Sequence, residues 1–244
     1  MHTIIPARRD PRNRINWNHR MPLQDQLDRI TQNTRALVQP ERLAVSEAAT
    51  AALFQSGIED RMLSLGAKAS NFTLTDAVTN KPVHLADVLS LGPVVLKFFR
   101  GRWCPYCVTE LEQWRDLHTD LRRRGAHLLA ISPQTRRQND FTLQQHGLPF
   151  PILSDPGAEI ARAYGLAHTI PQAQRAYYRS ILVNIPFANA GLSYDTATEA
   201  SWTLPLPATF LVKQDGTIAF AEAHADFHVR PEPADLFAAL DRLS

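Results

Sequence analysis

Residues 98–110 read FFRGRWCPYCVTE, and this segment contains the only two cysteines of the 244-residue chain, Cys104 and Cys107. It lies where an apolar run typical of a buried strand (93–99, PVVLKFF) gives way to a segment with apolar residues at helical spacing (111–121). The pattern predicts a strand that leads into a helix through a turn that carries both cysteines.

Two cysteines at this spacing are neighbours on a helix and lie close enough for a disulfide. A thiol nucleophile must be a thiolate, and an ordinary cysteine titrates at about 8.5, so its pKa must be lowered. Pro105 suits the first helical turn, which places Cys104 at the helix start, where free N–H groups favour an anion. Arg100 and Arg102 are candidate cations, and the Cys107 thiol is a candidate hydrogen-bond donor. We therefore expect Cys104 to be the more exposed sulfur.

Three other uses of the pair stay open. A zinc site needs about four ligands, and His224 and His228 would complete one only if the fold brought them close. A structural disulfide across so short a loop gains little stability. Two buried, inert thiols are compatible with the sequence because free cysteine is often a core residue. The position beside a strand-to-helix pattern in a cysteine-poor chain favours a redox pair, with no metal and no other cofactor.

The composition, with 44% hydrophobic and 20% charged residues, is ordinary for a globular protein. No apolar run is long enough to span a membrane or to form a signal-peptide core, so we expect a cytoplasmic protein without a membrane partner. Reductants in that compartment keep a dithiol active. The net charge of +2 is too small to indicate nucleic-acid binding. Residues 1–20 are nevertheless locally basic, with Arg8, Arg9, Arg12, Arg14 and Arg20.

The chain is expected to divide into an N-terminal arm with a helical extension (1–65) and an α/β domain (66–244). The extension should contain helices at 23–38, 41–55 and 58–65. It holds no cysteine and no acid-base cluster, which indicates packing or a homodimer contact rather than chemistry.

From residue 66 onward, the pattern alternates between strands and helices. Strands are expected at 71–75, 81–85, 93–99, 126–132, 150–153, 203–213 and 217–223, and helices at 111–125, 138–146, 159–164 and 232–243. This alternation predicts βαβ units and a sheet covered on both faces. The apolar residues of 166–202 do not recur at a regular spacing. This segment is expected to form an insertion, with a helix at 172–179 and a loop after it.

Pro207 precedes the apolar part of the strand expected at 203–213. A proline here can be cis, which would leave the preceding backbone free to receive an extended partner segment. The alternative, favoured by base rates, is an ordinary trans proline on an edge strand.

Several ordered motifs resemble one known group of proteins. WCPYC at a strand-to-helix turn, LPLPATF before a hairpin and a closing helix resemble the thioredoxin-like superfamily, and within it the peroxiredoxin-like AhpC/TSA proteins that carry C-x-x-C. The similarity covers roughly 66–240 and includes the AISPQ, LSDPG, PATFLVKQDG and VRPEP stretches. It implies a thioredoxin-like, peroxiredoxin-type three-layer sandwich, with a central mixed sheet, helices on both faces and an N-terminal helical extension.

The resemblance allows two alignments of Cys104 and Cys107 with the motifs of known families, and the two alignments assign different roles to the cysteines. In the thioredoxin and glutaredoxin pattern, Cys104 attacks the substrate and Cys107 resolves. In the peroxiredoxin pattern, Cys107 begins a C-x-T-E motif as the peroxidatic cysteine, and Cys104 stands where a hydroxyl residue is usual. Typical peroxiredoxins also have an arginine that stabilises the peroxide-cleaving transition state, at the position that Ala208 occupies here.

A substitute for that arginine would have to come from Arg100, Arg102 or Arg230. Arg230, in the VRPEP stretch, is the first candidate. Its alternative role is a surface ion pair with Glu232 or Asp226.

Motif and resemblance together predict an oxidoreductase: a thiol-dependent peroxidase that reduces hydrogen peroxide or organic hydroperoxides through a Cys104/Cys107 dithiol–disulfide cycle. A thioredoxin or glutaredoxin-type protein is the expected reductant. The residues expected to support the cysteines are Arg100, Arg102, Trp103, Pro207 and Arg230.

The alternative functions are a thiol-disulfide oxidoreductase and a non-enzymatic redox sensor or metal-binding module. Sulfenic acid is expected mainly at Cys107 if peroxide is the substrate, whereas a mixed disulfide at Cys104 would indicate disulfide exchange.

Overall fold

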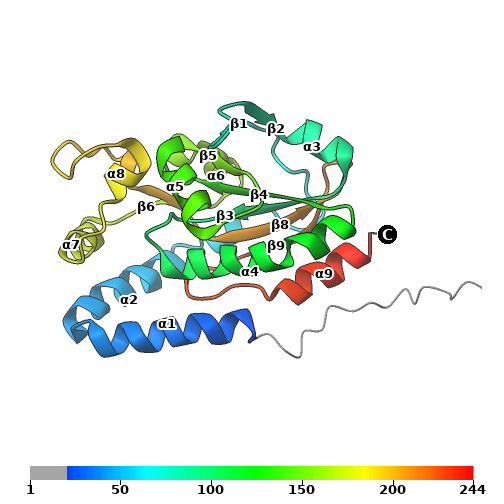
Figure 1. Ribbon diagram of the computed structural model, residues 1–244. Coiled ribbons are helices and arrows are strands. Elements are labelled where there is room, and N and C mark those ends of the chain that lie inside the picture. Colours follow the sequence, from blue (N-terminus) through cyan, green and yellow to red (C-terminus); the bar gives the residue numbers. More distant parts are fainter. Residues whose placement is uncertain (1–20, 244) are drawn as a thin grey trace, which may run out of the picture.

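A mixed seven-stranded sheet forms the centre of the protein, whose structure, a computed structural model, describes residues 21–243 (Figure 1). Its strands are β1 (Thr73–Asp76), β2 (Pro82–His84), β3 (Val94–Phe98), β4 (His127–Ser132), β5 (Ile152–Ser154), β8 (Ala208–Val212) and β9 (Ile218–Ala223). The strand order is β2-β1-β5-β4-β3-β8-β9. β3 pairs in parallel with β4 and antiparallel with β8, so the expected mixed sheet is confirmed.

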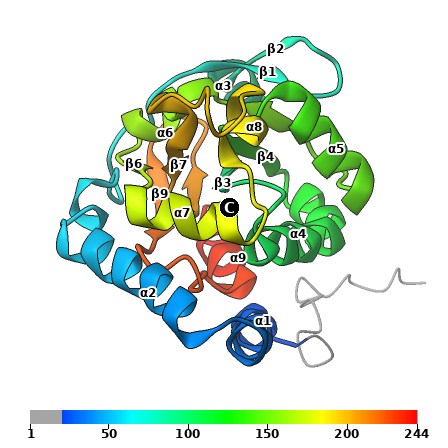
Figure 2. The ribbon, with the colours of Figure 1, turned by 90° about the vertical axis from the view of Figure 1, so that its left-hand side faces the viewer.

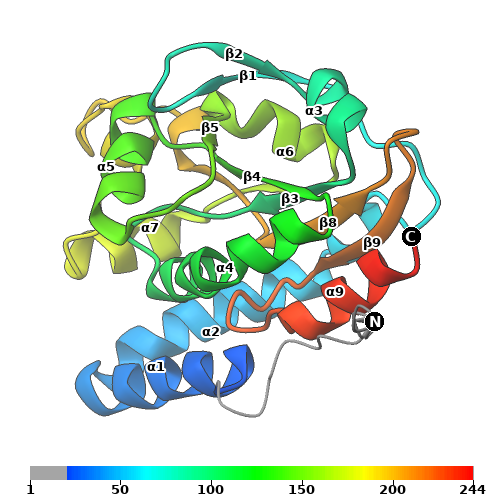
Figure 3. The ribbon, with the colours of Figure 1, turned by 45° about the vertical axis from the view of Figure 1, so that its right-hand side comes forward.

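Helices cover both faces of the sheet, as Figure 3 shows. The helices are α1 (Leu23–Leu37), α2 (Pro40–Gln55), α3 (Leu85–Leu91), α4 (Pro105–Arg123), α5 (Arg136–His146), α6 (Glu159–Ala163), α7 (Gln172–Ser180), α8 (Ile185–Ala190) and α9 (Pro233–Asp241). Side chains of α4, α5 and α9 pack in one apolar core, and those of α3 and α6 pack in another on the opposite face. The three-layer sandwich predicted from the sequence is therefore confirmed.

β3 lies inside the sheet and positions the cysteine turn. Every residue of β3 is buried, including Lys97. Val95 packs toward α4, whereas Leu96 and Phe98 pack toward the other face. A strand buried on both faces reads as a continuous apolar run, which is why 93–99 was recognisable.

The N-terminal helices pack against the domain. Leu23 and Leu27 of α1 are fully buried in the same core as α4. The Glu232 carboxylate accepts hydrogen bonds from the backbone N–H groups of Leu23 (3.0 Å) and Gln24 (2.8 Å). This carboxylate caps the start of α1 from the far end of the chain, where unpaired N–H groups need an acceptor. α2 lies beside α7, as Figure 2 shows.

The helix expected at 58–65 is wrong, because only the 3-10 turn Glu59–Arg61 forms there. The backbone N–H groups of Leu63 and Gly66 donate instead to Tyr164 and Ile218. An isolated helix of this length has little stability, so the hydrogen bonds to Tyr164 and Ile218 decide the conformation of this segment.

The insertion is more regular than expected. α8 follows α7 where a loop was expected, and β6 (Ala167–Thr169) pairs with β7 (Thr203–Pro205) in a second, two-stranded sheet. The strand expected at 203–213 is thus two strands, β7 and β8. The insertion and β7 together form a third apolar core, which consists of Ile170, Tyr178, Ile185, Trp202 and Leu204.

No helix between residues 21 and 243 has both the length and the apolar character of a membrane span. The basic stretch predicted within residues 1–20 lies outside the described residues.

Leu27→Ala should lower the free energy of unfolding by about 2–5 kcal/mol, because it leaves a cavity where α1 meets the core. Leu37→Ala is the matched control on the same helix; Leu37 is 85% exposed, so the change should stay within about 0.5 kcal/mol. Urea denaturation measures both. Equal small changes would contradict the docking of α1.

Candidate active site

The turn between β3 and α4 places both cysteines at one end of the sheet. Cys104 is the N-cap of α4, and Pro105 is the first helical residue, as expected. Gly101 has φ +150°, and a Cβ there would lie 2.6 Å from Trp103 Nε1. Glycine is thus needed at this position for the Trp103 ring to pack against the turn.

Both cysteines are free thiols, and both are buried, Cys104 with 1% and Cys107 with 0% of its surface exposed, so the expected order of exposure holds but the difference is very small. The two sulfurs nevertheless differ in access. Cys104 lines a cavity of about 960 Å³ between α1, α2, α7 and the loop after β9, and Cys107 is not among the residues of that lining. Of the two sulfurs, Cys104 is therefore the one that borders the cavity.

The electrostatic surroundings also separate the two thiols. Burial raises the pKa of Cys104, but hydrogen bonds from the Cys107 thiol and backbone and the charges of Arg100 and Arg230 outweigh it and lower this pKa to about 6. Burial raises the pKa of Cys107, and the neighbouring Cys104 sulfur raises it further. These opposite shifts favour a Cys104 thiolate that accepts a hydrogen bond from the Cys107 thiol at neutral pH.

Arg100 is a buried cation at the base of the cavity. Its guanidinium lies between two rings, 4.1 Å from the centroid of Phe227 and 4.9 Å from that of Trp103. It also donates a hydrogen bond to the Tyr178 hydroxyl. These contacts hold a positive charge in place without a carboxylate to neutralise it.

A buried ion cluster lies beneath the cysteines. Glu110 of α4 pairs with Lys97 of β3 and, at 2.9 Å, with Nε of Arg230. Lys97 also donates to the Thr209 hydroxyl. Burial lowers the pKa of Lys97, and the Glu110 carboxylate opposes that shift. Nη2 of Arg230 lies 3.7 Å from Sγ of Cys107.

The remaining residues singled out from the sequence lie in different places. Trp103 lines the cavity and packs edge-to-face on Tyr178. Arg102 extends toward α5, where its Nε donates to Gln138 at 2.9 Å, and is not brought to the sulfurs. Pro207 lines a smaller cavity of about 210 Å³ that also reaches Arg100.

The structure also decides the alternatives considered for Arg230 and Pro207. The surface ion pair of Arg230 with Glu232 or Asp226 does not form, because Arg230 is buried against Glu110. Pro207 is trans, as the alternative predicted, because the described chain contains no cis peptide. The edge-strand part of that alternative is wrong, since Pro207 directly precedes β8, which lies between β3 and β9.

The histidines considered as metal ligands have other partners. His224 Nε2 lies 3.0 Å from a Glu222 oxygen, and His228 Nδ1 contacts Asp226. Within residues 21–243, no group of three or more His, Cys, Asp or Glu side chains is arranged to hold a metal ion.

Comparison with known proteins identifies the family. The model of the AhpC/TSA family matches residues 65–221, well over half of the chain. The chain belongs to the AhpC/TSA family. The thiol-disulfide oxidoreductase ResA of Bacillus anthracis is 30% identical over 126 residues, which cover 51% of this chain and 71% of ResA. The chloroplastic peroxiredoxin Q of Triticum aestivum is 30% identical over 111 residues, 46% of this chain and 50% of that protein.

Solved structures show the same fold. The crystal structure of peroxidoxin BcpB from Mycobacterium tuberculosis superposes with a TM-score of 0.56 at 21% identity, covering 75% of this chain and 99% of that one. The thioredoxin-like fold predicted from the motifs is confirmed. The family and the relatives make the chain an oxidoreductase, and the family implies a thiol reductant as its partner.

Sequence reasoning missed four contributors to the site of this AhpC/TSA protein: Lys97, Glu110 as the partner of Arg230, Tyr178 and α1. Lys97 carried a signal, since a lysine within a buried apolar strand needs a partner. Nothing local marked Tyr178 or α1, because their contacts depend on the packing of the insertion and the extension.

Glu110→Ala should lower the free energy of unfolding by about 3–5 kcal/mol, because it leaves two buried cations uncompensated. Glu112→Ala, on the same helix, is the control. Glu112 is partly exposed and contacts only His146 at 3.0 Å and Arg115 at 3.9 Å among the ion pairs of the described chain, so its loss should cost at most about 1 kcal/mol. Denaturant titration of both variants measures the difference, and equal costs would contradict a buried role for Glu110.

Proposed function

We propose that the protein is a thiol-dependent peroxidase in which Cys104 attacks hydrogen peroxide or an organic hydroperoxide and Cys107 resolves the product. One observation carries this proposal: the thiol whose pKa is lowered to about 6 is also the one that lines the cavity. A nucleophile must be both ionised and reachable, and Cys104 alone of the pair combines the two properties.

The proposed reaction has two steps. The Cys104 thiolate attacks the terminal peroxide oxygen; an S–O bond forms, the O–O bond breaks, and the released alkoxide or hydroxide takes up a proton. Sulfur is oxidised by two electrons and the peroxide is reduced. The Cys107 thiol then attacks the Cys104 sulfenic acid, and a disulfide forms with loss of water. An external dithiol, thioredoxin or a glutaredoxin-type protein, reduces this disulfide in a reducing compartment such as the cytoplasm.

The leaving oxygen needs a preorganised positive donor, and Ala208 does not supply one. Arg100 is our first choice for this role, because its guanidinium lies at the cavity base and, unlike that of Arg230, carries no ion pair with a carboxylate in the described chain. Arg230 faces Cys107 and would help the resolving sulfur when it ionises. This assignment places the sulfenic acid on Cys104 rather than on Cys107, where the peroxiredoxin register alone predicts it.

A second candidate function is disulfide reduction. The C-P-Y-C arrangement with Cys104 as the N-cap and the similarity to ResA favour it. In that reaction Cys104 would form a mixed disulfide with the substrate and Cys107 would release it. A non-enzymatic redox sensor or metal-binding module is the third candidate.

Peroxide consumption coupled to thioredoxin or to a glutaredoxin-type protein tests the proposal, with reduction of a protein disulfide as the parallel assay. Cys104→Ser should abolish turnover of peroxide, and Cys107→Ser should accumulate sulfenic acid on Cys104 after one turnover. Arg100→Met should lower the rate of peroxide attack by about 10²- to 10³-fold.

Sulfenic acid that accumulates only in Cys104→Ser would overturn the assignment of the attacking sulfur. Fast disulfide reduction without peroxide turnover would favour the second candidate. If neither reaction exceeds that of the Cys104→Ser, Cys107→Ser double mutant, both enzyme functions fail. Stoichiometric zinc in protein purified under reducing conditions would then favour the third candidate.

A further inference from the structure

The cavity at Cys104 is much larger than hydrogen peroxide requires. Its volume of about 960 Å³ is near the upper end of the range of cavities that bind drug-sized ligands. Around the sulfur its lining is aromatic, with Trp103, Tyr106, Tyr178 and Phe227. Most of the lining surface is apolar, although charged side chains such as Asp28, Arg35 and Glu47 also border the cavity, which is partly open to solvent. An apolar surface of this extent gives no advantage in binding hydrogen peroxide, but it would stabilise the apolar body of a larger peroxide.

The outer wall of the cavity comes from α1 and α2. Thr31, Thr34 and Val38 line it from α1, and Ser46 and Ala51 line it from α2. These five side chains are small or branched and leave space between the larger side chains that also line the wall, which include Arg35 of α1 and Phe54 of α2. Both helices precede residue 65, where the match to the AhpC/TSA model begins, so this wall is an addition to the family domain.

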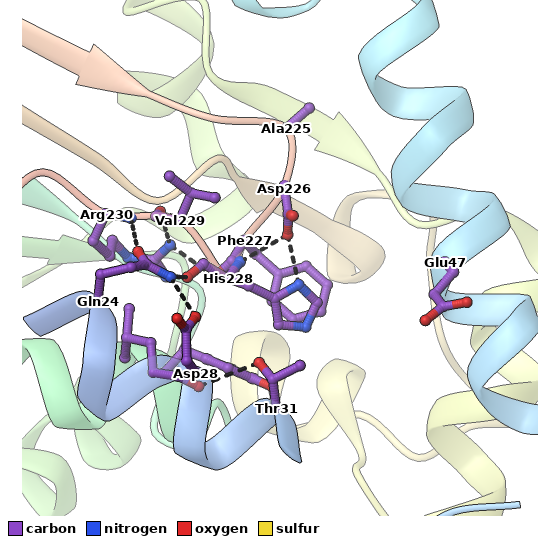
Figure 4. A network of polar contacts seen from close by, with 12 residues as sticks. Gln24, Asp28, Thr31, Glu47, Ala225, Asp226, Phe227, His228, Val229 and Arg230 are labelled. Carbon is purple, nitrogen blue, oxygen red and sulfur yellow. Dashed lines mark hydrogen bonds and ion pairs between the residues drawn. The ribbon is translucent and has the colours of Figure 1, made fainter. Parts of the chain in front are cut away.

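Polar contacts hold the α1 wall in place, as Figure 4 shows. Gln24 Nε2 donates to the His228 carbonyl (3.1 Å) and to Asp28 Oδ1 (2.9 Å), and Gln24 Oε1 accepts from the Arg230 backbone N–H (3.3 Å). Farther along α1, the Thr31 hydroxyl lies 3.2 Å from the Tyr106 hydroxyl of the C-P-Y-C motif. The wall is therefore anchored both to the loop after β9 and to the cysteine helix.

We propose that α1 and α2 make this cavity a specificity pocket for organic hydroperoxides with a bulky apolar body, and that Ala51, Ser46 and Thr34 determine this preference. The inference rests on the peroxidase function proposed above. The hydroperoxide group would reach Cys104 at the cavity base, and the alcohol formed when the O–O bond breaks would leave through the opening between the helices.

The test compares cumene hydroperoxide with hydrogen peroxide, with dithiothreitol as the reductant so that docking of a protein reductant does not affect the rates. The readout is the ratio of kcat/KM for the two peroxides. Ala51→Trp fills the cavity from α2. Ala48→Trp is the matched control, because Ala48 is an exposed alanine on the same helix that does not line the cavity. Thr34→Trp fills the cavity from α1 and provides a second, independent variant.

The wild-type protein should favour cumene hydroperoxide by about tenfold or more in kcat/KM. Ala51→Trp and Thr34→Trp should each lower this ratio by about tenfold, whereas Ala48→Trp should leave it within about twofold. Turnover of both peroxides with a ratio that neither cavity variant changes would overturn the specificity inference alone. The absence of turnover with either peroxide would instead overturn the peroxidase function, and this inference with it.

Discussion

The buried pairing of Glu110 with Lys97 and Arg230 is the interaction on which the site depends. It joins three elements far apart in sequence: β3, α4 and the loop after β9. Arg230, held by Glu110, places the Nη2 atom of its guanidinium 3.7 Å from Sγ of Cys107. The same loop continues to Glu232, which caps α1. One loop thus carries both Arg230, which contacts Cys107, and Glu232, which caps the helix that lines the cavity.

The asymmetry of the two cysteines follows from this arrangement. Cys104, at the start of α4, has the cavity on one side and a hydrogen-bond donor on the other, so its charged form is favoured. Cys107 is one turn deeper and has no share in the cavity lining. Under the proposed function, a substrate in the cavity would therefore reach Cys104 first, although the peroxiredoxin-like C-x-T-E motif begins at Cys107.

Features fixed by neighbouring residues could be predicted from the sequence. The turn from β3 to α4, Pro105 at the first helical position and most strands follow from apolar periodicity and local caps. Features fixed by distant contacts could not. The partner of Arg230 is 120 residues away, and the insertion folds around its own core. The position of α1 depends on contacts with α4 and with the loop after β9, including Glu232. Lys97 is an exception, because a lysine within an apolar strand predicts a buried carboxylate as its partner, and Glu110 is that partner.

The central claim is that Cys104 is the reactive thiolate. Its direct test is the pH dependence of alkylation of the reduced wild-type protein by limiting iodoacetamide, with the modified residue located by peptide fragmentation. The thiolate is present above its pKa, so labelling should fall on Cys104 and its rate should rise with a midpoint at about pH 6. Labelling first at Cys107, or a midpoint near the ordinary thiol value of about 8.5, would contradict the account.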